Sequence, residues 1–341
     1  MSKKWQGGIV TPTPATPSGP YDTSSAPGIW TLSQQAYWGK QGLWPTAGNA
    51  LPTARAYVVG GYTAAGGGQT LMQYVVITTT GNSSSFGNLT TAQYNGGALS
   101  SFTRGVLLGA GGGTSDKMQY ITLGTSGTET LFGNLSSASA YWAGASNGVR
   151  GVMAGNTMTY ITIASTGNTT AFGSLTESRE GSGSVNSTTR SIFLGGEAGG
   201  STKVNTIDYV TNATTGSATD FGDLSQVTSF QQGGCSSSTR GVVHLGTNSV
   251  ITSALAYITM ATTGNSTSFG LLTSTVTWTA QTSSGVRGLT FGGDIKNSGQ
   301  GINVIDYITI ASAGNATDFG DLSAITARAV ALSNAHGGLS A

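Results

Sequence analysis

Residues that could carry catalysis or bind a metal are few and scattered in this chain. The two histidines, His244 and His336, occupy unrelated positions, and the single cysteine, Cys235, lies among Gly and Ser residues. Zinc and copper sites usually need several His or Cys ligands, and a nucleophilic thiol needs a neighbouring base. We therefore expect His244 to be a strand residue, His336 a terminal surface residue and Cys235 a small buried side chain. The same reasoning predicts no enzymatic activity, no cofactor and no metal site.

Carboxylates recur with the same spacing at two places in the chain, as Asp208, Asp220 and Asp223 and again as Asp306, Asp318 and Asp321. On a hairpin such a set could bind Ca²⁺ with the help of backbone carbonyl oxygens. Capping of turns is the commoner role of Asp at such positions, and we expect it here. The Asp-Phe-Gly triplets at Asp220 and Asp318 match a kinase motif, but the other kinase motifs are missing.

Composition excludes several classes of protein. Only 8% of the 341 residues are charged and the net charge is +1, so the chain lacks the basic face that binds nucleic acid. No apolar run approaches the roughly 20 residues of a membrane helix, and the first residues lack the apolar stretch of a signal peptide. A single cysteine excludes an internal disulfide, which is consistent with assembly in a reducing cytoplasm.

Three sequence features repeat six times along the chain. A Phe-Gly motif, followed by Leu two residues later in five copies and by Leu-Leu in the sixth, begins at Phe86, Phe132, Phe172, Phe221, Phe269 and Phe319. A tyrosine stands 12 residues before each Phe, at Tyr74, Tyr120, Tyr160, Tyr209, Tyr257 and Tyr307. An arginine opens a short apolar run in each copy, at Arg55, Arg104, Arg150, Arg190, Arg240 and Arg287. We expect the Tyr and Phe rings to be mostly buried between units, and each Arg to pack on the neighbouring unit and bond carbonyl oxygens there.

Each repeat contains four short strand signals separated by turn residues, which we name a, b, c and d in chain order. Four strands in 40–50 residues is typical of a propeller blade, and the small residues of the a segments suit crowded strands around a central axis. The first repeat lacks an a strand, whereas Ala327–Ser333 lies in that register at the other end of the chain. The sequence therefore predicts an all-β fold: a β-propeller of six four-stranded kelch-like blades over residues 54–341, closed by the C-terminal strand.

Residues 1–53 differ from the repeats. They contain all seven prolines and four of the six tryptophans, Trp5, Trp30, Trp38 and Trp44. Pro-rich segments without repeats favour extended structure, so we expect an extended N-terminal arm that docks on the propeller or on a partner.

Variation in repeat length is confined to the segment between Arg and Tyr, which is the b–c loop of each blade. Repeat proteins place insertions on one face, which is often the binding face. The third b–c loop is the shortest, so we expect a depression at that blade. The residues expected to contact partners lie in these loops and in the arm: Trp5, Trp30, Trp38, Trp44, Tyr62, Glu197, Lys203, Asp294 and Lys296.

Double glycines close the b segments at Gly60-Gly61, Gly195-Gly196 and Gly292-Gly293, as in kelch repeats, and an aromatic pair follows in each unit. The segment Asn303–Leu322 resembles the kelch-like repeats of tailed-bacteriophage virion proteins, particularly those of marine phages and cyanophages. The resemblance covers Arg55 to the C-terminus. It implies a non-enzymatic structural protein of the virion, in the tail, a fibre or the capsid decoration, that is assembled in the host cytoplasm and contacts other virion proteins.

The alternative interpretation is an adhesion module at a tail tip that binds a host receptor or glycan. A glycan site would bring aromatic residues such as Tyr62, Tyr94, Trp142 or Trp278 together in a cleft beside polar groups. The exposure of these rings distinguishes the two interpretations.

Overall fold

The computed structural model describes residues 31, 33–34, 53–109, 115–229, 233–246, 251–295 and 299–335. Its contacts divide the chain into two units, Met1–Thr53 and Ala54–Ala341. In the first unit Ser33 and Gln34 are helical, and the backbone N–H of Thr31 donates to Gln34 Oε1 while Gln34 N–H donates to Thr31 Oγ1. This reciprocal pair is a capping box, which is a local departure from the extended structure predicted for the arm.

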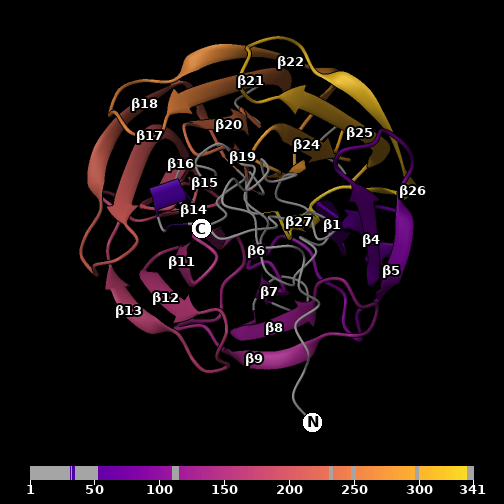
Figure 1. The fold of residues 1–341 in the computed structure, drawn as a ribbon, viewed down its shortest axis with the longest axis horizontal. Coiled ribbons are helices and arrows are strands. Elements are labelled where there is room, and N and C mark those ends of the chain that lie inside the picture. Colours follow the sequence, from indigo (N-terminus) through magenta and orange to yellow (C-terminus); the bar gives the residue numbers. More distant parts are fainter. Residues whose placement is uncertain are drawn as a thin grey trace. The chain divides into compact units, whose positions relative to one another are not determined.

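The second unit is a six-bladed β-propeller, as the repeats predicted (Figure 1). Each blade is an antiparallel sheet whose a strand lies nearest the axis and whose d strand lies outermost. The sheet of the fourth blade counts five strands because its a strand is split around Gly181.

The blades contain the following strands in a-to-d order. Blade 1 consists of β27 (Val330–Ser333), β1 (Arg55–Val59), β4 (Leu71–Val76) and β5 (Ser84–Asn88), with a small hairpin of β2 (Tyr62–Thr63) and β3 (Gly67–Gly68) beside it. Blade 2 consists of β6 (Gly97–Ser100), β7 (Arg104–Leu108), β8 (Lys117–Thr122) and β9 (Thr130–Asn134). Blade 3 consists of β10 (Ala143–Ser146), β11 (Arg150–Ala154), β12 (Met158–Thr162) and β13 (Thr170–Gly173). Blade 4 consists of β14 (Arg179–Glu180), β15 (Gly183–Asn186), β16 (Arg190–Ala198), β17 (Thr202–Thr211) and β18 (Thr219–Thr228). Blade 5 consists of β19 (Cys235–Ser236), β20 (Arg240–His244), β21 (Thr252–Thr259) and β22 (Thr267–Val276). Blade 6 consists of β23 (Ala280–Ser283), β24 (Arg287–Phe291), β25 (Ile302–Thr309) and β26 (Thr317–Thr326).

The predicted ring closure is confirmed. β27 pairs antiparallel with β1, and Ser333 faces Ala56 while Val330 faces Val59. The end of this strand is also bound to the first blade, because Arg55 N–H donates to Asn334 Oδ1 at 2.7 Å. The ring is thus closed by strands from the two ends of the propeller sequence, which gives blade 1 the same four strands as the other blades.

The apolar core is divided into six clusters, one at each junction between blades. All six repeat phenylalanines are buried in these clusters, as predicted. The six tyrosines are less completely covered than the phenylalanines, but most of each side chain is buried, as predicted. Each Tyr ring packs edge-to-face on the Phe of its own blade, at centroid distances of 5.9–6.2 Å, and lies under the arginine of that blade.

The repeat arginines link neighbouring blades. Each guanidinium lies 4.3–4.5 Å from the Tyr ring of its own blade. Arg104 Nη1 also donates to the carbonyl oxygens of Ile163 and Ala164 in the next blade, both at 2.9 Å, and the four arginines from Arg150 to Arg287 bond the next blade in the same way. For these five blades the structure confirms the packing role predicted for the arginines.

A second link joins the outer strands. The c–d turn of blade 3 lies against blade 2, where Gly167 N–H donates to Phe132 O at 2.8 Å and Asn168 Oδ1 accepts from Asn134 N–H at 2.9 Å. A side chain at Gly133 would overlap the carbonyl of Gly167, so the glycine of the Phe-Gly motif allows this approach. The turn asparagine therefore bonds the preceding blade.

Candidate functional site

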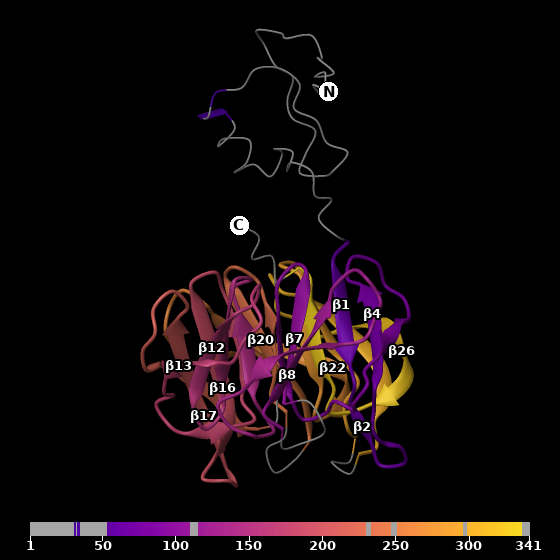
Figure 2. The same cartoon turned by 90° about the horizontal axis from the view of Figure 1, so that it is seen from below.

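The b–c loops lie on one face of the propeller, together with the connections that lead into the a strands. Figure 2 shows β2 and the turn between β16 and β17 at this same edge of the disc. At the opposite end, the channel between the a strands narrows to a cavity of about 60 Å³ lined mainly by small residues, where Ser146 Oγ donates to Ser100 O. That end has room only for water, so the b–c face is where a larger ligand could bind.

Four of the predicted contact residues are described by the structure, and all lie on the b–c face. Tyr62 is half-buried in β2, while Glu197 and Lys203 are partly exposed and face each other across β16 and β17. Asp294 differs from the prediction, because its side chain has no exposed surface and its carboxylate accepts from Gly299 N–H. It therefore holds the blade 6 loop together. Trp5, Trp30, Trp38, Trp44 and Lys296 lie outside the described residues.

A ring of six residues surrounds the mouth of the channel on the b–c face, and we call it the collar. Each member stands two residues before the start of an a strand, or of its second part in blade 4, and has a φ between 56° and 95°. The collar consists of Arg328, Asn95, Tyr141, Gly181, Gly233 and Trp278. Backbone hydrogen bonds connect successive members: Arg328 N–H donates to Trp278 O, Asn95 N–H to Arg328 O, Tyr141 N–H to Asn95 O and Gly181 N–H to Tyr141 O, at 2.7–3.1 Å.

The side chains of the collar gather into an aromatic cluster. Tyr141 of blade 3 and Trp278 of blade 6 come from opposite sides of the ring, yet their ring centroids are 5.9 Å apart. The Arg328 guanidinium lies 4.5 Å from the Trp278 ring and 5.3 Å from the Tyr62 ring, and Tyr62 contacts Tyr94 at 5.4 Å. Aromatic rings from four blades thus meet over the axis. Trp142, which the sequence placed in the same group, is instead buried in the core between blades 2 and 3.

A recess of about 380 Å³ lies where the short connection of blade 3 predicted a depression. It is lined by Asn156, Ser178, Glu180, Glu197, Gly199 and Gly200. Glu180 and Glu197 face each other across β14 and β16. Burial, and then the neighbouring charge of Glu197, raise the pKa of Glu180. Burial also raises the pKa of Tyr141, which lies within the electrostatic reach of Arg328, Glu180 and Glu197.

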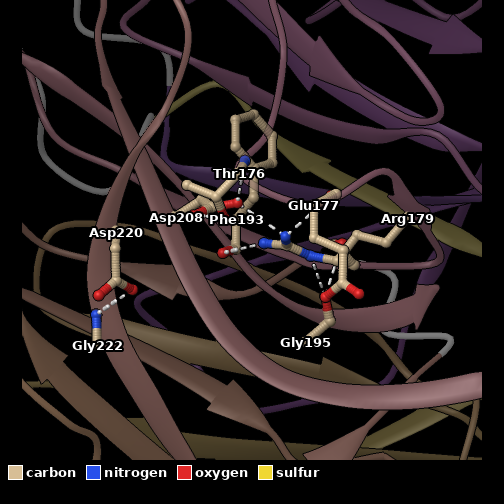
Figure 3. Close-up of polar contacts among 9 residues, drawn as sticks. Thr176, Glu177, Arg179, Phe193, Gly195, Asp208, Asp220 and Gly222 are labelled. Atoms are coloured by element: carbon tan, nitrogen blue, oxygen red, sulfur yellow. Dashed lines mark hydrogen bonds and ion pairs between the residues drawn. The ribbon is translucent and has the colours of Figure 1, made fainter.

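A buried ion pair holds β14 in place (Figure 3). Arg179 Nη1 lies 2.7 Å from Asp208 Oδ2, and neither side chain has exposed surface. Arg179 Nε also donates to Gly195 O, and Asp208 accepts from the backbone N–H and the hydroxyl of Thr176. Since β14 carries Glu180, this pair positions one carboxylate of the recess.

The remaining candidate residues have structural roles. Asp220 Oδ1 accepts from Gly222 N–H and Asp318 Oδ1 from Gly320 N–H, which confirms turn capping at these two positions. Asp306 is buried and accepts from Thr273 of the preceding blade. Within the described ranges, no three His, Cys, Asp or Glu side chains lie close enough together to hold a metal ion.

His244 and Cys235 are both buried strand residues, as predicted. His244 Nε2 lies 2.8 Å from Thr252 O and Nδ1 lies 3.0 Å from Thr279 Oγ1, and burial lowers the pKa of the imidazole to about 4. Burial raises the pKa of the Cys235 thiol to about 12, so the thiol is unreactive at neutral pH. His336 lies outside the described residues.

Sequence reasoning missed Tyr141, Glu180, Arg179 and Arg328. A signal for the collar is present when the repeats are aligned just before each a segment, where two repeats have Gly and one has Asn. Those residues tolerate positive φ, so a Tyr, Trp or Arg at the same position is unexpected. No such signal exists for the partnership of Arg179 with Asp208, because no other repeat has it.

No model of a known protein family matches the chain, and no curated protein matches it. In the part of the chain that the structure describes, no helix has the length and apolar character required to span a membrane.

Proposed function

We propose that this protein is a non-enzymatic structural component of a tailed-phage virion, in which the propeller is a rigid module that contacts partners through its b–c face. The observation that carries the proposal is the separation of a uniform scaffold from one variable face. Phe, Tyr and Arg repeat at fixed positions and join the blades, whereas insertions and unusual residues gather on the b–c face. The resemblance of the repeats to those of phage virion proteins supports the same function.

The residue chemistry also supports a binding protein rather than an enzyme. His244 and Cys235 are buried, and their side chains are engaged by Thr252 and Thr279 and by the Thr282 carbonyl oxygen, respectively. The lining of the recess has one hydroxyl, that of Ser178, beside the two carboxylates, and no His, Lys or Arg among its residues to activate it. Propellers support many activities, so the argument depends on these residues and not on the fold.

The location can be tested by purifying particles on a density gradient from a culture that produces this chain. Gold-labelled antibody against the propeller should decorate the tail, a fibre or the capsid surface. Recovery of the chain only in the fraction that does not sediment with particles would overturn the proposal.

The face can be tested with a bulky maleimide attached to one introduced cysteine, since the buried Cys235 thiol should not react. The cysteine of Ser201→Cys would lie on the b–c face, in the exposed turn between β16 and β17. The cysteine of Val149→Cys would lie on the opposite face, in the exposed a–b turn of blade 3. The adduct at position 201 should block incorporation into particles and the adduct at 149 should not. The opposite pattern would exclude the b–c face.

One observation favours a second candidate function, adhesion to a glycan. Tyr62 and Tyr94 do come together, half-buried, and Arg328 lies between Tyr62 and Trp278, although Trp278 itself is buried. Aromatic rings beside polar groups were the arrangement expected of a glycan site.

A further inference from the structure

Three collar residues have a backbone conformation that is unfavourable for their side chains. Tyr141, Trp278 and Arg328 have φ values of 63°, 56° and 57°. The equivalent positions of blades 4 and 5 are Gly181 and Gly233, which adopt positive φ without steric cost. Bulky residues in this region are rare and tend to mark sites where function requires the side chain.

Two polar atoms at the collar lack partners. Asn95 is 6% exposed, and its Oδ1 makes no hydrogen bond; the same is true of the buried Nε of Arg328. These two residues are adjacent in the collar, since Asn95 N–H donates to Arg328 O. A buried polar atom without a partner is destabilising, and such atoms call for a specific explanation. One is an acceptor and the other a donor, so a group that both donates and accepts would satisfy both.

A sugar hydroxyl is such a group, and the surrounding rings suit the C–H face of a sugar. Tyr62 and Tyr94 are half-buried and pack on each other, and Tyr141 is half-buried and packs on the buried Trp278, so the exposed parts of the three tyrosine rings supply apolar surface. Ligand sites typically combine such aromatic surface with a few placed polar groups. We propose that the collar and its aromatic cluster bind a saccharide whose hydroxyl groups form hydrogen bonds with Asn95 and Arg328. This inference rests on the proposed contact role of the b–c face.

The charges around the site indicate that this saccharide is neutral. Arg328 contributes one positive charge, and it is stacked between Trp278 and Tyr62. Glu180 and Glu197 lie close enough to influence Tyr141, and they would repel a uronate or sialate. The carboxylates can accept hydrogen bonds from further hydroxyls of a chain that extends into the recess.

The repeats themselves supply variants that preserve the backbone. Tyr141→Gly and Trp278→Gly introduce the residue found in blades 4 and 5, and Arg328→Asn introduces the residue found in blade 2. Each removes one part of the site and keeps a residue suited to positive φ. Val149→Ala, an exposed apolar position on the other face, is the matched control. Far-UV circular dichroism and melting temperature identify folded variants.

The test uses the full chain on an array of immobilised neutral oligosaccharides of glucose, mannose, galactose, rhamnose and N-acetylglucosamine, with alginate as the anionic sugar. Binding to at least one neutral sugar is expected, and calorimetry with that sugar should show affinity unchanged between low and high salt. Each folded collar variant should lose at least about tenfold in affinity, a loss of roughly 1.4 kcal/mol, and Val149→Ala should lose none.

Binding to no neutral sugar, binding to alginate alone, or folded collar variants that bind like the parent would each overturn this inference. These results leave the particle experiment unaffected. A chain that decorates particles without binding sugar fails only the saccharide proposal, and a chain that binds sugar but never sediments with particles fails only the virion proposal.

Discussion

Removal of Arg179 tests whether the buried ion pair fixes the fourth blade. Arg179→Met keeps most of the side-chain volume but removes the charge and the four hydrogen bonds of the guanidinium. Asp208 would then be a buried carboxylate held only by Thr176. Breaking a buried pair by removing one partner typically costs about 3–5 kcal/mol, because the other charge stays buried without compensation. We expect a loss in this range.

The double variant separates the charge from the packing. Arg179→Met with Asp208→Asn removes the uncompensated charge, so at least about half of the lost stability should return. Arg150→Met is the matched control: Arg150 stacks on Tyr160 and bonds carbonyl oxygens, but no buried carboxylate depends on it. The control should lose only about 1–2 kcal/mol.

The measurement is equilibrium unfolding in urea at neutral pH, followed by tryptophan fluorescence, because urea does not screen the ion pair. The slope of free energy against urea should stay constant across the variants, so that differences in midpoint report stability. A loss below about 1 kcal/mol for Arg179→Met, or no recovery in the double variant, would show that the pair does not have the role described.

Three further predictions concern the scaffold. The pKa of His244 is about 4 in the fold against 6.5 for a free imidazole, so the full contribution of the neutral side chain to stability is present above pH 6.5, and about 3 kcal/mol is lost as the pH falls towards 4. In urea unfolding, His244→Leu should reduce the dependence of the free energy of unfolding on pH. The same pH dependence in the variant and the parent would contradict this prediction. Phe132→Ala should cost about 3–5 kcal/mol in the same assay, whereas the exposed neighbour Leu131→Ala should change stability by less than about 0.5 kcal/mol; equal losses would refute the assigned burial. Gly133→Ala should lower the free energy of unfolding by about 1–3 kcal/mol because its methyl group would overlap the next blade, whereas Gly127→Ala should have no such effect because the space around Gly127 is open. Unchanged stability of Gly133→Ala would show that the contact between the c–d turn and the preceding blade is dispensable.

Blade number, strand order and ring closure could be predicted from the sequence alone. Each depends on residues that repeat at fixed spacing, because every blade must fill the same junction with its neighbour. Phe132 is buried at a blade junction like its five counterparts, and Arg104 shares its bonds to the next blade with four of its five counterparts, so the same packing recurs around the ring. Closure could be predicted because Ala327–Ser333 supplies the segment that the first repeat lacks.

The tertiary structure alone decided which unlike residues meet. Tyr141 and Trp278 are 137 positions apart in sequence, yet their rings touch because blades 3 and 6 face each other across the axis. Arg179 and Asp208 become an ion pair only because the a strand of blade 4 is split and folds over a buried carboxylate. Repetition reveals positions that must be alike, since packing is the same in every blade. The collar contains positions where the blades differ, and no local pattern indicates that residues of opposite blades meet there, because the closed ring brings them together.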